Sequence, residues 1–595
     1  MVKHERLGDA DGAGLAGGLT WSRGATDALS LHAVSLLTVA TVFTLFFLRS
    51  LDDNRLTSWR WVFGAQDAFP FLFLLAAAVL LAYAAARWFP RMPRPALVLF
   101  PGAFAAAALL WSEPEVIVDA ARYFTQAKHV ELYGVGYFLS AWGGDIPAWT
   151  DLPLVPLLYG SVFSLFGEER LYIQACTSLL FAGTVVLTYW LGRTLWNEAV
   201  GVAAGALLLG MPYLLVQVPL MLVDVPTMFF VMLAVWATLA AVRRGGPARL
   251  ALASVAIALA LCTKYSAWLL LSVLPVVALA EWRAQPAAVP RRACVIAALA
   301  AMLVGFAWMP MAEVASAQLA LLRDYQAPGL GRWQESLVST FLFQIHPFIP
   351  VAALASLVLA WRARDARYAI VAWLPLLMLA LGVRRARYLL PMFPMLALMA
   401  AYGLQALRSA DLRRHAVLCV VATSLAIALF GFLPFLQAAS AANLQRAGAY
   451  LDTLDDEWVE VITLPQSRSS INPAISVPLL DLHTAKRLVS GVEQNPSPPA
   501  GFERSPLRFT WEGQYQGARY YRESAAGGRP RPVVVIGSDA AAELRPQLAQ
   551  RLAEHRLARE FADSENVFGY RTLVRVYLPK STGAFRPSEN SHGKC

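Results

Sequence analysis

Residues 220–242 read LMLVDVPTMFFVMLAVWATLAAV, an apolar run with a single aspartate, Asp224, near its start. A helix that crosses the hydrocarbon core of a bilayer needs roughly 20 apolar residues, and this run supplies them. A charged group in such a segment costs several kcal/mol, so an acidic residue there is a functional hypothesis by default. The stretch therefore predicts a membrane-spanning helix with a candidate site at one end.

The composition of the whole chain agrees with a membrane protein. Of its 595 residues, 57% are hydrophobic and only 15% are charged, whereas about 25% of the residues in a soluble domain are charged. Apolar runs recur from Leu29 to Leu433, and they predict an all-α polytopic domain of about 13 spans. The predicted spans are 29–48, 68–86, 95–111, 171–192, 198–216, 225–242, 249–263, 265–281, 293–312, 338–361, 368–383, 388–407 and 415–434.

The basic residues of the chain predict its orientation. The formal charge is +10, but the arginines cluster in short loops between spans, as the positive-inside rule expects, so we expect no nucleic-acid partner. If these loops are cytoplasmic, the N-terminal tail is inside and the chain after residue 435 is outside. The abundance of Ala and Arg is typical of a bacterium, so we expect a multi-pass protein of a bacterial inner membrane.

One apolar segment does not fit this alternation. Residues 152–166, LPLVPLLYGSVFSLF, are short and contain Pro153 and Pro156. A full crossing here would leave Asp119 and Asp224 on opposite membrane faces. We therefore expect this segment to lie along the outer membrane edge.

A change in composition predicts a second, extracytoplasmic α/β domain. EVITL at 460–464, PVVVIGS at 532–538 and TLVRVYL at 572–578 are predicted strands. Residues 539–561 are a predicted helix, with Ser538 or Asp539 as its cap, and residues 465–530 are predicted loops. The predicted organisation is a cytoplasmic tail (1–28), a transmembrane domain (29–434) with a long outer loop (112–170), an extracytoplasmic domain (435–580) and a disordered tail (581–595).

Two carboxylates and one lysine face the same, outer side on this topology. Asp119 lies in the long outer loop, Asp224 begins a span, and Lys264 lies at a turn between two spans. Carboxylates suit a general base or the binding of a hard divalent metal. Each residue also has a purely structural interpretation. Asp119 is then a solvated loop acid, Asp224 the start of a helix before Pro226, and Lys264 a lysine that extends to the membrane interface.

The stretch RRARYLLP at 384–391 adds arginines to the same face. Arg384, Arg385 and Arg387 lie there against the positive-inside trend, and such arginines favour an anionic partner such as phosphate. A sugar carried on a lipid phosphate fits this face, because its tail lies in the bilayer and its phosphate at the interface.

In their order and spacing, these motifs resemble the GT-C membrane glycosyltransferases of the protein mannosyltransferase and aminoarabinose transferase type (family 39). The resemblance covers roughly residues 110–410. Asp119 matches the acidic residue of the first large outer loop, and Asp224 lies in an LxxxDVPxxFF segment. Lys264 matches the xTK turn, and Arg387 opens RYLLPMFP.

Two positions depart from the family pattern. Asp119 is followed by Ala120, where the family often has Glu, and the edge motif has Asp151 where relatives have a basic residue that contacts the donor phosphate. Other cations of the chain must then supply the charge for a phosphate.

The resemblance implies an inverting, integral-membrane glycosyltransferase. It implies transfer of a sugar from a polyprenyl-phosphate donor to a glycan, lipid or protein acceptor on the extracytoplasmic face. Asp119 and Asp224 are the implied catalytic residues, and they are also the ligands if a divalent metal takes part. The implied donor-phosphate residues are Lys264, Arg384, Arg387 and Tyr388, and the secondary candidates are Lys128, Glu131, Asp145 and Asp151.

Two other functions remain open at this point. A secondary transporter could use Asp119 and Asp224 as coupling sites, although transporters usually contain internal repeats and none is evident here. A non-catalytic membrane protein of polysaccharide assembly is the second alternative.

Overall fold

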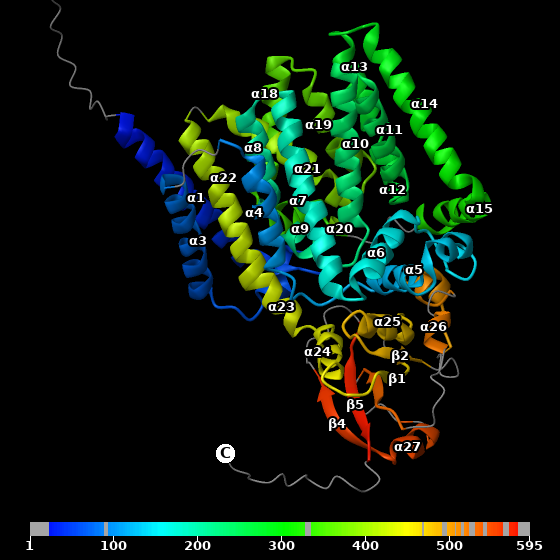
Figure 1. Ribbon diagram of the computed structural model, residues 1–595. Coiled ribbons are helices and arrows are strands. Elements are labelled where there is room, and N and C mark those ends of the chain that lie inside the picture. Colours follow the sequence, from blue (N-terminus) through cyan, green and yellow to red (C-terminus); the bar gives the residue numbers. More distant parts are fainter. Residues whose placement is uncertain are drawn as a thin grey trace, which may run out of the picture.

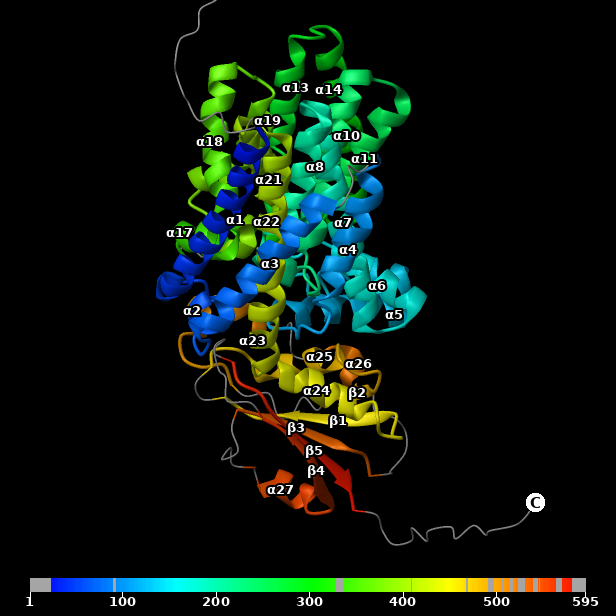
Figure 2. The same ribbon diagram turned by 90° about the vertical axis from the view of Figure 1, so that its left-hand side faces the viewer.

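The computed structural model shows a bundle of long helices above a small sheet domain (Figure 1). A view turned by 90° shows the same two layers (Figure 2). The structure describes residues 23–88, 93–327, 335–407, 409–466, 469–490, 497–505, 507–512, 517–522, 530–538, 544, 546–562 and 570–580. Residues 1–22 of the predicted N-terminal tail, the predicted C-terminal tail, the cap residue Asp539 and several predicted loop residues lie outside these ranges, whereas residues 23–28 are helical.

The bundle has the helices of a multi-pass membrane protein. In the described part of the chain, eight helices are long and apolar enough to cross a membrane, and a bent pair would make a ninth span. Each of the thirteen predicted spans lies on one of these helices, on the bent pair or on a shorter apolar helix. The eight are Leu29–Phe47, Ala68–Trp88, Arg170–Leu195, Asp224–Arg244, Tyr265–Trp282, Ala288–Gln326, Ala386–Ala406 and Ala410–Ala438.

The remaining apolar helices are bent or short. The bent pair joins Leu337–Gln344 to Phe348–Ala363 at an angle of 113°. The shorter helices are Ala96–Ala108, Leu154–Phe166, Glu198–Gly210, Pro247–Leu261 and Tyr368–Ala380.

The labelled helices of the bundle have the following bounds. They are α1 (Arg23–Phe47), α3 (Ala68–Trp88), α4 (Ala96–Ala108), α7 (Arg170–Leu195), α8 (Glu198–Leu207), α9 (Pro212–Gln217), α10 (Asp224–Arg244), α11 (Pro247–Leu261), α12 (Tyr265–Leu270), α13 (Val273–Trp282), α14 (Ala288–Trp308), α18 (Phe348–Ala363), α19 (Tyr368–Ala380), α20 (Ala386–Leu389), α21 (Phe393–Gly403), α22 (Ala410–Ile427) and α23 (Leu433–Ala438).

Small residues allow these helices to approach closely. A Cβ atom on Gly192 of α7 would lie 2.9 Å from the Cα of Gly201 in α8. A Cβ atom on Gly403, at the end of α21, would lie far inside the van der Waals distance of Ala352 in α18. Lipid tails are as apolar as the helices, so close packing at small residues is a main source of association in a membrane.

Two helices lie between the bundle and the sheet domain (Figure 1). They are α5 (Asp119–Ala141), which is kinked at Gly134, and α6 (Leu154–Phe166). The predicted outer loop is therefore largely helical. The 13 residues of α6 span about 20 Å at 1.5 Å per residue, less than the roughly 30 Å of a bilayer core. Its place at the membrane edge stays a prediction, and the length of α6 supports it.

The helical segment that starts with α14 extends beyond the predicted span 293–312. After a 3₁₀ turn at Met309–Met311, α15 (Ala312–Leu321) and a π-helix, η4 (Leu322–Gln326), follow. Ala288–Gln326 is therefore one long apolar helical segment.

The sheet domain contains five strands in the order β2-β1-β3-β5-β4. The pairs β1/β2 and β1/β3 are parallel, with Glu460 opposite Val533, whereas β3/β5 and β4/β5 are antiparallel. The strands are β1 (Trp458–Thr463), β2 (Arg487–Val489), β3 (Val533–Gly537), β4 (His555–Phe561) and β5 (Leu573–Pro579). The helices of this domain are α24 (Ala442–Leu451), α25 (Ser476–Asp481), α26 (Arg519–Arg522) and α27 (Pro546–Leu552).

The three predicted strands are confirmed as β1, β3 and β5, but the predicted helix over 539–561 is wrong. Among the described residues of that stretch, α27 is the one helix, and β4 follows it. The edge strand β4 is mostly exposed, so its sequence HRLAREF lacks the apolar alternation of a half-buried strand. The three-residue strand β2, in a region predicted to be loops, was too short to predict.

The sheet domain is docked on α5 and α6 by a continuous apolar core. One cluster of buried residues joins Phe124 of α5 and Tyr159 of α6 to Leu480 of α25, Val461 of β1 and Tyr520 of α26. This core fixes the sheet domain against the helix that begins at Asp119.

Candidate active site

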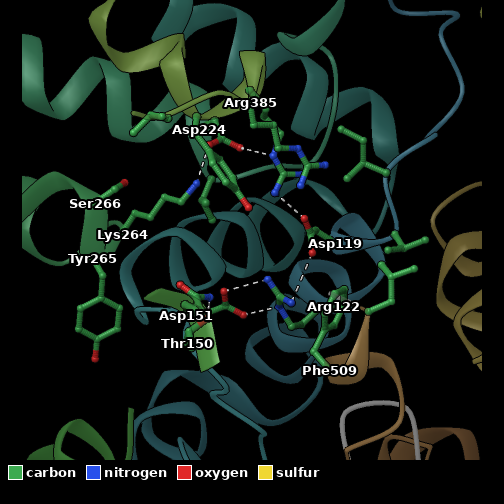
Figure 3. A pocket seen from close by; sticks show the side chains of 18 of the residues that line it. Asp119, Arg122, Thr150, Asp151, Asp224, Lys264, Tyr265, Ser266, Arg385 and Phe509 are labelled. Atoms are coloured by element: carbon green, nitrogen blue, oxygen red, sulfur yellow. Dashed lines mark hydrogen bonds and ion pairs between the residues drawn. The ribbon is translucent and has the colours of Figure 1, made fainter. Parts of the chain in front are cut away.

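A cavity of about 1130 Å³ lies where the bundle, the helix pair α5/α6 and the sheet domain meet. It is larger than the 300–1,000 Å³ that is usual for a small-molecule pocket, so two substrates can occupy it together. Figure 3 shows its charged side chains converging from several elements. Asp119 comes from α5, Asp224 from α10 and Arg387 from α20, while Lys264 precedes α12.

Arg387 links two aspartates of the cavity, Asp119 and Asp224. Lys264 Nζ donates to Asp224 Oδ1 over 2.7 Å. Arg387 Nε lies 3.5 Å from Asp224 Oδ2, and Arg387 Nη2 donates to Asp119 Oδ2 over 2.5 Å. Asp224 is 2% exposed, so its charge depends on these two cations.

The linkage continues on the other side of Asp119. Arg122 Nη1 lies 3.5 Å from Asp119 Oδ1, and Arg122 Nε lies 2.5 Å from Asp151 Oδ2. Carboxylates and cationic side chains therefore alternate through the cavity (Figure 3). We call this set the ion-pair chain; its members in order are Lys264, Asp224, Arg387, Asp119, Arg122 and Asp151.

Local sequence explains why both acids reach the cavity. Asp119 and Asp224 are the first residues of α5 and α10. The positive end of a helix dipole stabilises a carboxylate in the first turn. Arg122 follows Asp119 by three residues, which places both side chains on one face of α5.

The pKa values of Asp119 and Asp151 are shifted in opposite directions. Burial raises the pKa of Asp119, but the positive charges of Arg387 and Arg122 outweigh it, so the net pKa lies well below the usual value. At Asp151 burial outweighs the charge of Arg122, and the nearby Asp119 adds to it, so the pKa is raised. Asp119 is thus firmly ionised in this state.

The structure brings most of the primary predicted residues together. Asp119, Asp224, Lys264, Arg387 and Tyr388 all line the cavity. The Lys264 Nζ atom lies 5.3 Å from the centroid of the Tyr388 ring, a cation–π distance.

Arg384 differs from that prediction. Its side chain is exposed, while that of its neighbour Arg385 is buried and lines the cavity, 5.3 Å from the Tyr388 ring centroid. The sequence placed three arginines at this turn but did not show which of them faces inward.

The secondary candidates are divided. Asp151 joins the ion-pair chain, whereas Glu131 and Asp145 lie away from the described cavity lining. Tyr137 donates to Asp145 over a long 3.4 Å, near the surface. Lys128 lies between Glu168 and Asp481, 2.7 Å from each, where it ties α5 to the sheet domain.

Several cavity residues were missed by sequence reasoning. Arg122 could have been found from its i,i+3 spacing to Asp119. Trp149, Tyr325, Ser470 and Phe509 carry no local signal, because packing of distant segments brings them to the cavity.

The two aspartates do not fit a divalent metal as they are arranged. Each is already paired with cations. Within the described ranges, no group of three His, Cys, Asp or Glu side chains could hold a metal ion. We derive no step through a metal.

Comparison with known proteins agrees with this architecture. Residues 147–309 match the family described as dolichyl-phosphate-mannose-protein mannosyltransferase. The crystal structure of ArnT from Cupriavidus metallidurans bound to undecaprenyl phosphate is similar at a TM-score of 0.50 and 14% identity, over 81% of this chain and 97% of that chain. The chain has the GT-C fold. The resemblance predicted from the order of its motifs is confirmed.

A second solved structure is more distant from this GT-C chain. The oligosaccharyltransferase AglB from Archaeoglobus fulgidus, in complex with an inhibitory peptide and a dolichol-phosphate, matches at a TM-score of 0.39 and 12% identity, over 78% of this chain and 69% of that chain. No curated protein matches the sequence.

Proposed function

We propose that this protein is an inverting glycosyltransferase that moves a sugar from a polyprenyl-phosphate donor to an acceptor on the extracytoplasmic face. The ArnT structure bound to undecaprenyl phosphate and the dolichyl-phosphate-mannose family match support a lipid-phosphate donor. The observation that carries the proposal is the state of Arg387. Its Nη1 atom is buried and has no hydrogen-bond partner among the described residues, and its Nε atom makes only a long ion pair of 3.5 Å with Asp224.

A buried arginine donor without a partner calls for a ligand. Buried polar groups are nearly always hydrogen-bonded in native proteins, and a guanidinium matches the geometry of a phosphate. A donor phosphate beside Arg387 would give Nη1 a partner and replace the long contact of Nε. Lys264, which is 24% exposed at its side chain, and Arg385 would add positive charge at the same place.

The chemistry then assigns a role to each member of this group. The acceptor hydroxyl attacks the anomeric carbon, and Asp119 takes the hydroxyl proton. The bond between the anomeric carbon and the phosphate oxygen breaks, and its electron pair leaves with the polyprenyl phosphate. Arg387 and Lys264 stabilise that charge, which is usually the largest contribution to such a rate. One displacement inverts the anomeric centre.

Asp119 becomes an effective base only when the arginines paired with it also bind a second anion, the donor phosphate. In the described state, Arg387 and Arg122 hold its pKa low, and an efficient general base needs a pKa nearer the working pH. A phosphate that engages Arg387 would weaken its hold on Asp119, so donor binding would raise the pKa of the base. Asp224 would keep Arg387 and Lys264 in position.

Sidedness is part of the proposal. The basic loops of the sequence predict a cytoplasmic turn at Arg364 and an outer sheet domain. In a variant without its native cysteines, a cysteine at position 364 should react with a membrane-impermeant reagent from the cytoplasmic side, and one at position 550 of α27 from the outside. Labelling of position 550 only from the cytoplasm would overturn the proposed face of transfer.

Transfer of a labelled sugar in proteoliposomes tests the activity itself. The wild-type protein, supplied with a panel of polyprenyl-phosphate sugars and a bacterial envelope extract, should transfer at least one sugar, and Asp119→Asn should slow that transfer at least about 100-fold. Transfer that is indifferent to Asp119 and Arg387 would refute the proposal.

A further inference from the structure

Two unusual backbone features meet at the outer end of the cavity. Trp149 has a φ of 48°, and it is one of only two non-glycine residues with a positive φ in the described chain. Such a conformation is a genuine outlier for a bulky residue, and it clusters at functional sites. The second feature is the π-helix η4, Leu322–Gln326, a form that also occurs often at functional sites.

Contacts between three segments hold Trp149 in place. The rings of Trp149 and Tyr325 meet at 74°, with centroids 5.5 Å apart. Gln326 Nε2 donates to Thr150 Oγ1 over 2.7 Å, so the π-helix is bound to both residues. Tyr325 Oη in turn donates to the backbone oxygen of Ser505, in the sheet domain, over 2.6 Å.

Trp149 remains partly open to the cavity. It is only half-buried and lines the cavity together with Tyr325, Gln326 and Phe509. A folded chain rarely strains its backbone to leave an indole beside water. The strain is explained if the ring forms one wall of a binding site.

The charges at this end of the cavity are already paired. Arg122 is paired with Asp151 and packed on the ring of Phe509, 4.8 Å from its centroid. Arg508 lies over Tyr325 at 5.3 Å and is paired with Glu512. This end therefore offers aromatic faces with neutral polar groups, in contrast to the Lys264 end.

We propose that Trp149 is the stacking platform for a neutral pyranose ring of the acceptor, so that the acceptor is a glycan. The inference rests on the proposed function and adds the substrate class. The C–H groups on one face of a pyranose carry partial positive charge, and the face of an indole is negative, so the two attract. Thr150 and Gln326 supply hydroxyl and amide groups beside the ring for sugar hydroxyls.

The order of the ion-pair chain assigns this platform to the acceptor rather than to the donor. Figure 3 shows Asp224 and Lys264 above Asp119, and Arg122, Asp151 and Phe509 below it. Trp149 precedes Asp151 by two residues and lines the same cavity. In an inverting displacement the acceptor oxygen lies opposite the leaving phosphate, next to the base. The platform is on the side where the acceptor must enter.

Binding can be measured without any transfer. We would use saturation-transfer NMR on the full-length protein in nanodiscs, with methyl glycosides of glucose, galactose, mannose, rhamnose and N-acetylglucosamine as probes. At least one glycoside should receive saturation on its apolar face. Trp149→Gly should weaken that binding about tenfold or more, since tryptophans are typical binding hot spots, whereas Trp149→Phe should keep part of it.

The glycine variant has a matched control. Glycine accepts a positive φ without strain, so Trp149→Gly removes the ring while easing the backbone. Arg364, at the C-terminus of α18, is the other residue of this kind, with a φ of 50°. Arg364→Gly makes the same backbone change away from the cavity and should leave glycoside binding unchanged.

Each outcome has a definite meaning. Glycoside binding that is equal in wild type and Trp149→Gly, or that no probe shows, would overturn the platform. Displacement of the glycoside by a polyprenyl-phosphate sugar, but not by polyprenyl phosphate alone, would assign the ring to the donor sugar and refute the acceptor role. Peptides that compete in place of glycosides would refute the glycan class. Trp149-dependent binding in a protein without transferase activity would refute only the proposed function.

Discussion

Replacement of Asp119 by asparagine is the most direct test of the mechanism, because the amide keeps the shape of the carboxylate and removes its charge. Arg387 would still be held by Asp224, 3.5 Å from its Nε atom, and an amide oxygen at position 119 can still accept from Nη2. The positions of the phosphate-binding cations should therefore change little.

The expected effects on stability and on rate differ in size. A hydrogen bond to a charged group contributes about 1.5–3 kcal/mol, and much of that is offset because the neutral amide is cheaper to bury, so we expect a loss of about 1–2 kcal/mol in the free energy of unfolding. A general base contributes about 10²–10⁴-fold in rate, or roughly 3–5 kcal/mol of barrier at 1.36 kcal/mol per factor of ten. The rate loss should thus exceed the stability loss.

The assay is steady-state transfer in proteoliposomes with a polyprenyl-phosphate sugar that supports wild-type activity. For Asp119→Asn we expect kcat to fall at least about 100-fold while the KM for the donor stays nearly constant. Asp119→Glu keeps the charge but moves the carboxylate by one methylene, and misplacement by about 1 Å can itself cost about 10²-fold. Asp456→Asn, in the exposed turn before β1, is the matched control and should be neutral.

The reasoning is refuted if Asp119→Asn transfers sugar at close to the wild-type rate. Asp151, the next carboxylate of the ion-pair chain, would then become the candidate base. A variant that loses donor binding and kcat together would instead show that Asp119 mainly orients Arg387.

Three further predictions concern the cations. Lys264→Ala should raise the KM for the donor about tenfold, as expected when a phosphate contact is lost, and Lys264→Arg should restore only part of it, because the two cations differ in geometry; donor titrations of the transfer rate would measure both. Arg387 and Arg122 hold the pKa of Asp119 well below its usual value, so the acid limb of kcat/KM should lie below the usual range for a carboxylate, and Arg122→Gln should move that limb to higher pH; an unmoved limb would contradict the assignment. Lys128→Met should destabilise the docking of the sheet domain by about 3–5 kcal/mol, since it leaves the buried carboxylate of Asp481 without its cation; limited proteolysis and thermal unfolding would detect it, and Lys486→Met, whose ammonium donates to the Leu454 backbone oxygen, is the control.

Sequence alone predicts the features of this protein that depend on one short segment at a time. These are the membrane spans, three of the strands and the acidic residues near the span ends. In a bilayer, every backbone polar group must be satisfied within the segment, so a run of about 20 apolar residues has few structures other than a helix. Asp224 and Lys264 interrupt such runs, and the cost of burying charge identifies them as candidates. The strands β1, β3 and β5 are short apolar segments with β-branched residues, and the same features identify them.

Other features were set by contacts between distant parts of the chain, which no local pattern records. The strand β4 exists because β5 pairs with it, although its own sequence is polar. Arg385 rather than Arg384 faces the cavity because of how the turn before α20 packs. Phe509 reaches Arg122 across nearly 400 positions of sequence. Sequence determines which segments the membrane accepts, since that depends on each segment alone. Tertiary structure decides which side chains share a cavity, since that depends on the packing of all of them together.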